Sequence, residues 1–345
     1  AWAEARRVRA HGGIVDGSTL GKIEVCGPEA GAFLDRLYVS RASPMRSGRA
    51  KYMVNLREDG MVLDDGLVLR VASDRFLATV SSGHAGHMLS HFEHYRETEW
   101  RGRAVTLTDV TEAWSVIVAA GPESRASLAR VLGAGWAEPL ATLEHMAFHD
   151  GQWRGAGLRL LRASFSGELA YELHCRPSIA LAMWQSLADA GLAPYGLDAL
   201  DILRVEKGYL TTSEITGQAT PMDLGMDALL RAGNACVGRD MLDRPAFHEG
   251  SRPRLVGLRA ADGRSPIPAG AQLTVGPGDS VPVGYVTSSA SSPALGQWVA
   301  LALLARNIPG EGAAVHARDP LRGASVQVLS CNPVHYDPHS RRMKS

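Results

Sequence analysis

One acidic residue in an apolar strand pattern constrains this chain more than any other feature. Residues 60–70 are mostly apolar and are bounded by Gly, Ser and Asp, which predicts a β-strand. Because side chains alternate between the two faces of a strand, Asp65 falls in the more apolar row. The other members of that row are Leu63, Leu67, Leu69 and Val71. An ionised carboxylate there is costly unless it is paired, so Asp65 is either a core residue with a hidden partner or a group that faces a ligand.

Composition excludes several classes of protein. Of 345 residues, 45% are hydrophobic and 21% are charged, and 36 basic side chains balance 36 acidic ones, which is typical of a globular protein. This balance, without a long run of one charge, argues against a nucleic-acid-binding surface. No apolar stretch approaches the roughly 18 residues of a membrane span, and no signal peptide is visible. The four cysteines are scattered without zinc-site spacing, so we expect a cytoplasmic protein.

The order of the predicted elements indicates a mixed α+β architecture. Three closely spaced strands at residues 52–56, 62–71 and 76–80 are typical of an antiparallel meander. The order strand, Gly-Pro turn, helix occurs twice, at residues 20–37 and 114–132. Further strands are expected at residues 105–110 and, as a hairpin around residues 166–168, at 157–165 and 169–175. Further helices are expected at residues 1–11, 84–95, 180–190 and 198–207.

The C-terminal part of the chain differs in composition. Pro, Gly and Arg accumulate around residues 244–253, and short strands separated by Gly/Pro turns follow. Such a segment predicts a compact β-barrel or sandwich. The boundary is therefore placed near residue 250, which divides the chain into residues 1–250 and a C-terminal domain of residues 251–345. The strands expected in this domain are residues 255–259, 272–275, 283–285, 298–304 and 325–329.

Two kinds of site are not predicted. The sequence has no G-x-G-x-x-G after a strand and no P-loop, H-E-x-x-H or G-x-S-x-G motif, so it carries no flavin or nicotinamide fingerprint. Four histidines form a single stripe on the predicted helix at residues 84–95, and imidazoles can bind zinc or copper. Ligands from one helix seldom complete a tetrahedral site, so a half-exposed helix face and no metal are expected. These histidines are His84, His87, His91 and His94.

Two further charged residues have both a structural and a functional interpretation. Glu172 lies on the less apolar face of the predicted strand 169–175, where it is either solvated or covered by a ligand. A carboxylate can accept two parallel hydrogen bonds from an amino-amidine edge such as that of a pterin. Arg204 lies near the inward stripe of the helix at residues 198–207. A buried arginine usually pairs with a carboxylate, which the protein or a ligand can supply.

Together these runs resemble the glycine cleavage T-protein (aminomethyltransferase) superfamily, and within it the C-terminal folate-binding half of the heterotetrameric sarcosine oxidase α subunit. The resemblance extends from near residue 10 to near residue 342 and is ordered along the chain. It is carried by residues 18–24, the Asp64-Asp65-Gly66 strand, and residues 164–172, 203–208, 220–226, 292–296, 337–338 and 340–342.

The resemblance implies a three-domain cloverleaf around a central folate channel, with a β-barrel as the last domain. It places Asp65 beside the folate nitrogen that takes up the one-carbon unit, with Tyr52 lining the same cavity. Glu172 matches the family glutamate that contacts the pterin ring, and Arg204 matches the arginine of the family's L-R-x-E-x-G helix. Phe165 stands where the family has a tyrosine, so a hydroxyl contact is lost while ring packing can remain. Arg341 and Arg342 are candidates for the folate glutamate tail only because they are basic.

The implied activity is transfer of a methylene-imine or formaldehyde-level unit to tetrahydrofolate, with Asp65 as the catalytic group and 5,10-methylene-tetrahydrofolate as the product. Because the chain has no flavin motif, a flavoprotein subunit or domain is expected to oxidise the small methylated amine. One alternative is a free-standing aminomethyltransferase or tetrahydrofolate-dependent demethylase. Another is a non-catalytic scaffold subunit of an oxidase complex.

Overall fold

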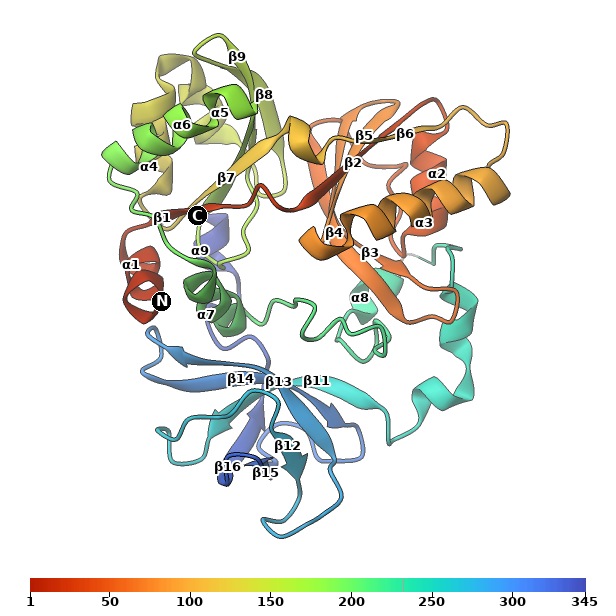
Figure 1. The fold of residues 1–345 in the computed structure, drawn as a ribbon, viewed down its shortest axis with the longest axis vertical. Helices are drawn as coiled ribbons and strands as arrows, with labels where there is room; N and C mark the ends of the chain where they lie inside the picture. The colour runs from red at the N-terminus through yellow and green to blue at the C-terminus, as the bar shows by residue number, and fades with distance from the viewer. Residues whose placement is uncertain (232) are drawn as a thin grey trace.

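The computed structural model describes residues 1–231 and 233–345, and within them the chain builds two antiparallel sheets and a closed barrel. Figure 1 shows these three units around a centre that is crossed by helix α7 (Leu197–Lys207). The architecture is mixed α+β with a C-terminal β-barrel, which confirms the predicted fold class.

The first sheet has five strands in the order β3-β4-β5-β2-β6. Its apolar residues pack against two helices, and the aromatic rings of Phe33, Phe92 and Tyr38 meet edge to face in this core. The strands are β2 (Gly21–Cys26), β3 (Arg49–Leu56), β4 (Val62–Ala72), β5 (Arg75–Val80) and β6 (Thr106–Asp109), and the helices are α2 (Ala30–Leu37) and α3 (Ala85–Thr98).

The second sheet also has five strands, in the order β1-β7-β10-β9-β8. Strand β1 precedes the whole first sheet in sequence yet pairs with β7, so the chain leaves the second sheet and returns to it. The strands are β1 (Gly13–Asp16), β7 (Ser115–Ala120), β8 (Phe148–Trp153), β9 (Ala156–Leu161) and β10 (Ala170–Cys175). The helices of this unit are α4 (Ser124–Leu132), α5 (Ala137–Thr142) and α6 (Pro177–Asp189).

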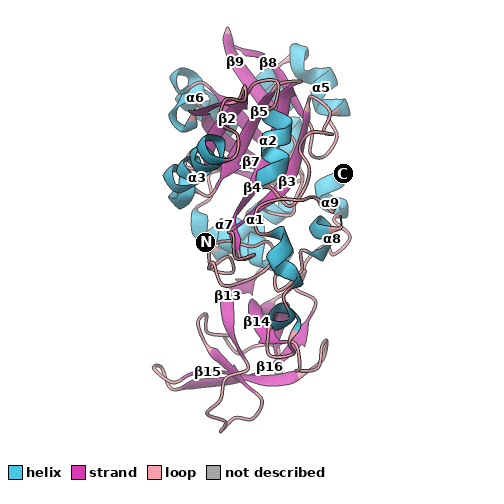
Figure 2. Ribbon diagram, turned by 90° about the vertical axis from the view of Figure 1, so that its right-hand side faces the viewer, coloured by secondary structure: helices cyan, strands magenta, loops and turns pink. Residues whose placement is uncertain are grey.

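The barrel closes in the order β11-β14-β13-β12-β15-β16 around an apolar core, and it forms the lower end of the molecule in Figure 2. Its strands are β11 (Pro253–Ala260), β12 (Gln272–Thr274), β13 (Gly284–Ser292), β14 (Gln297–Ala305), β15 (Ala314–Asp319) and β16 (Ala324–Cys331). Helix α7 packs on β13 and also contacts α1 (Trp2–Ala10), so it joins the barrel to the N-terminal segment. Gly208 ends α7 in the left-handed conformation, with φ 73°.

Several elements differ from the sequence prediction. Strands β1, β8 and β15 are not predicted, because they are short or mix polar and apolar residues without clear alternation. The expected hairpin of residues 157–165 and 169–175 exists, but its strands end at Leu161 and begin at Ala170. The connection between them is longer than predicted, and at its start the backbone of Arg162 forms hydrogen bonds with Met146 and Ala147. No helix in the described parts of the chain is long and apolar enough to cross a bilayer.

Candidate functional site

Asp65 and Tyr52 lie on one face of the hairpin formed by β3 and β4. Asp65 lies opposite Val54 in the register of this hairpin. Tyr52 lies two residues before Val54 and therefore on the same face. Its hydroxyl donates a hydrogen bond of 2.7 Å to Oδ2 of Asp65. Within the described residues Asp65 has no salt-bridge partner, so it is not a core carboxylate paired with a hidden cation.

The surroundings of Asp65 change its protonation behaviour. Burial raises the pKa of Asp65 to about 6, the hydrogen bond from Tyr52 opposes this rise, and the neighbouring Asp64 adds to it. Burial and the Asp65 charge likewise raise the pKa of the Tyr52 phenol, so this hydroxyl stays protonated and remains a donor. With no cation beside Asp65 among the described residues, desolvation is the main cause of this raised pKa.

Asp64, the other half of the acidic pair, points to the opposite face and is buried. One of its oxygens accepts a 3.0 Å hydrogen bond from the backbone N–H of Ser81, and the other lies 3.4 Å from Nδ1 of His84. These contacts fix the segment that enters α3. Asp64 therefore has a structural role, and Asp65 is the less deeply buried carboxylate of the pair.

Glu172 lies on the face of the second sheet that adjoins the first sheet. It lies opposite Leu161 of β9. On the first sheet, Tyr52 lies opposite Leu67. Leu67 packs against the apolar cluster that contains Leu161, and this cluster joins the two sheets. The sheet faces that carry Asp65 and Glu172 thus both adjoin this inter-sheet cluster, and a shared binding site for the two carboxylates stays a prediction.

Glu172 is held by its own strand. Nε2 of the buried His174 lies 2.9 Å from Oε2 of Glu172, whose side chain keeps 16% exposure. The alternate residues of β10 occupy the apolar core, as their spacing predicts. These core residues are Leu169, Tyr171, Leu173 and Cys175.

Phe165 is 40% exposed and stacks on Tyr209, with ring centroids 5.8 Å apart and planes inclined by 20°. Tyr209 was not predicted as a site residue, although it directly follows Gly208 in a run that carries the family resemblance. The aromatic face of Phe165 is chemically suited to stack on a reduced pterin, and carboxylates can accept the hydrogen bonds that its amino-amidine edge donates. The chemistry of Asp65, Glu172 and Phe165 is thus compatible with tetrahydrofolate, and their contacts with it stay a prediction.

Arg204 is held by partners within the protein. It is buried, and its guanidinium donates to Oδ1 of Asp201 at 2.7 Å, Oε2 of Glu214 at 3.0 Å and Oγ of Ser288 at 2.6 Å. A further donor reaches the carbonyl oxygen of Tyr209 at 3.2 Å. The protein thus supplies the carboxylate that a buried arginine requires. These contacts tie α7 to the barrel, and a contact between Arg204 and the cofactor stays a prediction.

The histidine stripe on α3 gives no metal site within the described residues, where no group of three or more potential ligands gathers. His84 interacts with Asp64, and His87 and His94 are exposed. His91 is half-buried, and burial lowers its pKa to about 4.

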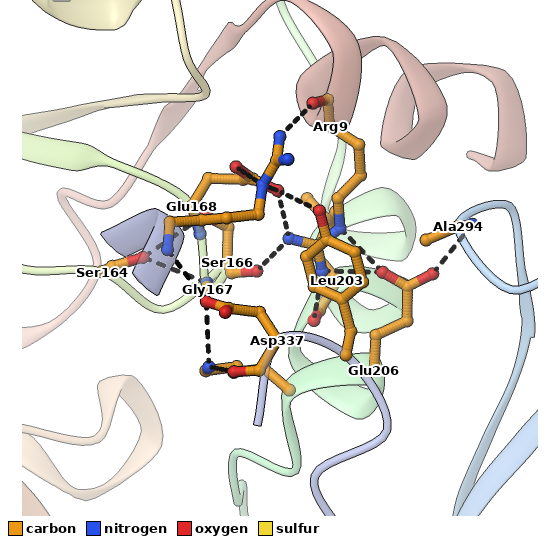
Figure 3. A network of polar contacts seen from close by, with 12 residues as sticks. Arg9, Ser164, Ser166, Gly167, Glu168, Leu203, Glu206, Ala294 and Asp337 are labelled. Atoms are coloured by element: carbon orange, nitrogen blue, oxygen red, sulfur yellow. Dashed lines mark hydrogen bonds and ion pairs between the residues drawn. The ribbon is translucent and has the colours of Figure 1, made fainter. Parts of the chain in front are cut away.

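The sequence did not reveal a buried network that joins both chain termini to α7 (Figure 3). Arg9 donates to Oε2 of Glu206 at 2.7 and 2.8 Å and to Oε1 of Glu168 at 3.0 Å. Glu168 also accepts from Nε of Arg342 at 2.7 Å and from the Tyr336 hydroxyl at 3.0 Å. Arg342 is therefore engaged by the protein. One sequence signal could have indicated that Arg9 is buried. Arg9 lies four residues after a buried alanine on α1 and therefore on the same face of the helix.

Comparison with known proteins identifies the family. The model described as "GCVT N-terminal domain" matches residues 1–233, and "Glycine cleavage T-protein C-terminal barrel domain" matches residues 254–337. The chain belongs to the glycine cleavage T-protein family. Enzymes of this family transfer one-carbon units and bind tetrahydrofolate.

Among the relatives, the "Sarcosine oxidase subunit alpha" of Rhizobium meliloti is 35% identical over 99% of this chain and 35% of that protein. The subunit of the same name from Corynebacterium sp. (strain P-1) is 36% identical. The chain spans about a third of the length of these subunits. An "Aminomethyltransferase" of Saccharopolyspora erythraea is 32% identical over 94% of this chain and 87% of that protein. The crystal structure of the glycine cleavage system aminomethyltransferase T from Bartonella henselae matches with a TM-score of 0.84, 25% identity and coverage of 99% of this chain and 90% of that one.

Proposed function

We propose that this member of the T-protein family takes a formaldehyde-level carbon unit released by oxidation of a methylated amine and transfers it to tetrahydrofolate. The observation that carries the proposal is the largely buried Asp65 carboxylate, held by one hydrogen bond from Tyr52 and free of a protein cation among the described residues. Its raised pKa of about 6 makes it a better proton acceptor than an ordinary aspartate and leaves it mostly ionised at pH 7.

The chemistry of the transfer needs a proton acceptor rather than an oxidant. Tetrahydrofolate, when bound, supplies the nucleophilic nitrogens, and condensation with formaldehyde releases one water, so the oxidation level of the carbon does not change. Tyr52 fixes Oδ2 of Asp65, which leaves Oδ1 to accept a proton from a nitrogen or to stabilise a developing cation. Glu172 and the Phe165 ring would hold the pterin, by hydrogen bonds and stacking respectively.

The oxidised amine would come from a flavoprotein partner. This part of the proposal is supported by the match of nearly the whole chain to sarcosine oxidase alpha subunits. Purification of the tagged chain from its native cells is expected to bring down a flavin-containing protein that oxidises sarcosine. The pair should yield 5,10-methylene-tetrahydrofolate when tetrahydrofolate is present and formaldehyde when it is absent. Sarcosine oxidation that yields only formaldehyde in both cases would contradict the proposal.

A free-standing aminomethyltransferase is the second candidate, because an aminomethyltransferase matches 94% of this chain over 87% of its own length. The two candidates differ in the donor that they accept. Isolated chain that makes methylene-tetrahydrofolate from an aminomethylated lipoyl carrier, and not from formaldehyde, would favour this alternative. A reduced-folate titration without binding would favour a non-catalytic scaffold.

Replacing Tyr52 with Phe is expected to shift the pH profile of transfer upward. The Tyr52 hydroxyl stabilises the ionised form of Asp65, so its loss raises the pKa of Asp65 further above about 6. Hydrogen bonds to charged groups are worth about 1.5–3 kcal/mol, which corresponds to about one to two pH units. The acidic limb of kcat/KM against pH, measured with formaldehyde and tetrahydrofolate, tests this. A profile that does not move would show that Tyr52 does not tune the carboxylate.

A further inference from the structure

His174 is the one side chain that the structure bonds to Glu172, within the described residues. It lies two residues further along β10, so both side chains project from the same face of the strand. The His174 ring is 1% exposed and its Nε2 lies 2.9 Å from Oε2 of Glu172. The periodicity of the strand places both residues on the less apolar face, but it does not predict that they bond to each other.

The ring is oriented by this one contact. An ionised Glu172 can only accept a hydrogen bond, so the contact requires that Nε2 of the imidazole carry a hydrogen. The other nitrogen, Nδ1, is buried and has no hydrogen-bond partner in the described part of the chain. The neutral ring with its hydrogen on Nε2 is therefore the form that avoids a buried and unpaired N–H group.

Among the described residues, the two nearby cations do not compete for this bond. Arg159 lies opposite His174 on β9, but its guanidinium forms a bidentate pair with Asp150 at 2.7 and 2.8 Å. The buried ammonium of Lys22 attracts Glu172 through space, but it is hydrogen-bonded to the carbonyl oxygens of Ser18 and Leu20. These residues leave His174 as the group that sets the rotation of the carboxylate.

We propose that His174 is a positioning residue for the pterin-binding function of Glu172. Its Nε2–H holds Oε2 and turns the carboxylate so that its free lone pairs face the space between the two sheets. A carboxylate can then present two parallel acceptors to an amino-amidine edge without first losing side-chain entropy. The inference rests on the proposed folate-dependent function and adds to it a residue that acts through Glu172.

A double-mutant cycle on the full chain tests this role, with calorimetric binding of 5-formyltetrahydrofolate as the readout. His174→Leu fills a similar volume without a donor, and we expect it to weaken binding about tenfold. His174→Gln places an amide donor near the position of Nε2 and should restore binding to within about threefold. In the Glu172→Gln background, the change from His174 to Leu should have little further effect, because a positioning residue acts only through its partner.

His149 provides a matched control, because it is an exposed histidine on β8 of the same sheet. His149→Leu should leave binding unchanged. Wild-type affinity in His174→Leu, or a full tenfold loss that persists in the Glu172→Gln background, would overturn the positioning role alone. Wild-type protein that does not bind 5-formyltetrahydrofolate would remove the proposed function together with this inference. A folded state shared by all variants is checked by their thermal unfolding.

Discussion

Replacing Asp65 with Asn is expected to lower folate-dependent one-carbon transfer by about 10²- to 10⁴-fold while reduced folate still binds, since this is the usual contribution of one general acid–base group. Asparagine keeps the shape of the side chain and can still accept the hydrogen bond from Tyr52, but it cannot take up a proton. Rates of methylene-tetrahydrofolate formation above the spontaneous reaction, together with calorimetric folate binding, separate the two effects.

The same substitution is expected to stabilise the protein. The pKa of Asp65 in the folded chain is about 6 and lies above its ordinary value of 3.8, so the folded state binds the proton more tightly than the unfolded state. The stability contributed by Asp65 therefore increases as the pH falls through about 6 and is lowest at neutral and higher pH. Asp65→Asn should raise the free energy of unfolding by about 1–3 kcal/mol at neutral pH, and by less at pH 5.

A matched control for this prediction lies in the same sheet, at the end of the strand that carries Asp65. Asp74 is exposed in the turn between β4 and β5, and Asp74→Asn should change neither transfer nor stability appreciably. Transfer that proceeds at the wild-type rate in Asp65→Asn would remove Asp65 from the mechanism. A loss of stability in that variant would show that the carboxylate is better solvated or paired than its surroundings indicate.

Replacing Arg9 with Met is expected to lower the free energy of unfolding by about 3–5 kcal/mol, because it leaves two buried carboxylates without their shared cation. Glu206 is fully buried and Glu168 is 1% exposed, and Arg9 bonds to both. The loss should appear in urea unfolding at constant protein concentration. Arg49→Met is the matched control, since Arg49 and its partner Glu144 are exposed, and such pairs contribute about 0–1 kcal/mol.

The Arg9 variant has a second expected effect. Glu168 lies three residues after Phe165 in the connection between β9 and β10, and the network of Figure 3 holds this connection against α7. Loosening this connection should weaken folate binding and also lower the free energy of unfolding. Arg9→Lys, which keeps the charge but cannot bridge two carboxylates in the same way, should fall between wild type and Arg9→Met. A change below about 1 kcal/mol in Arg9→Met would show that the network contributes little to folding.

Much of the fold and part of the site follow from local patterns in the sequence. Alternation along strands β4 and β10 placed Asp65 and the apolar core residues of β10 on the correct faces, because side-chain direction in a strand depends only on position along it. Short strands separated by Gly/Pro turns predicted a C-terminal β-barrel or sandwich, and the family resemblance implied the barrel that the chain forms. Short polar strands such as β8 gave no such pattern and were missed.

Charged partners could not be predicted in this way. Arg204 binds Glu214 and Ser288, and Arg9 lies 197 residues from Glu206 in the sequence. A periodic pattern shows which way a side chain points, but the group that it meets depends on how distant elements pack. The protein partners of Arg204 could not be predicted for this reason.

The sequence by itself therefore determined the family, the barrel, and the row in which the acidic side chain of β4 lies, since these depend on local alternation and ordered motifs. Only the tertiary structure decided the direction in which the pKa of Asp65 shifts, the partner of Glu172 and the network that joins the chain termini. Desolvation and ion pairing depend on the three-dimensional surroundings of a charge, and those surroundings come from residues far apart in the chain.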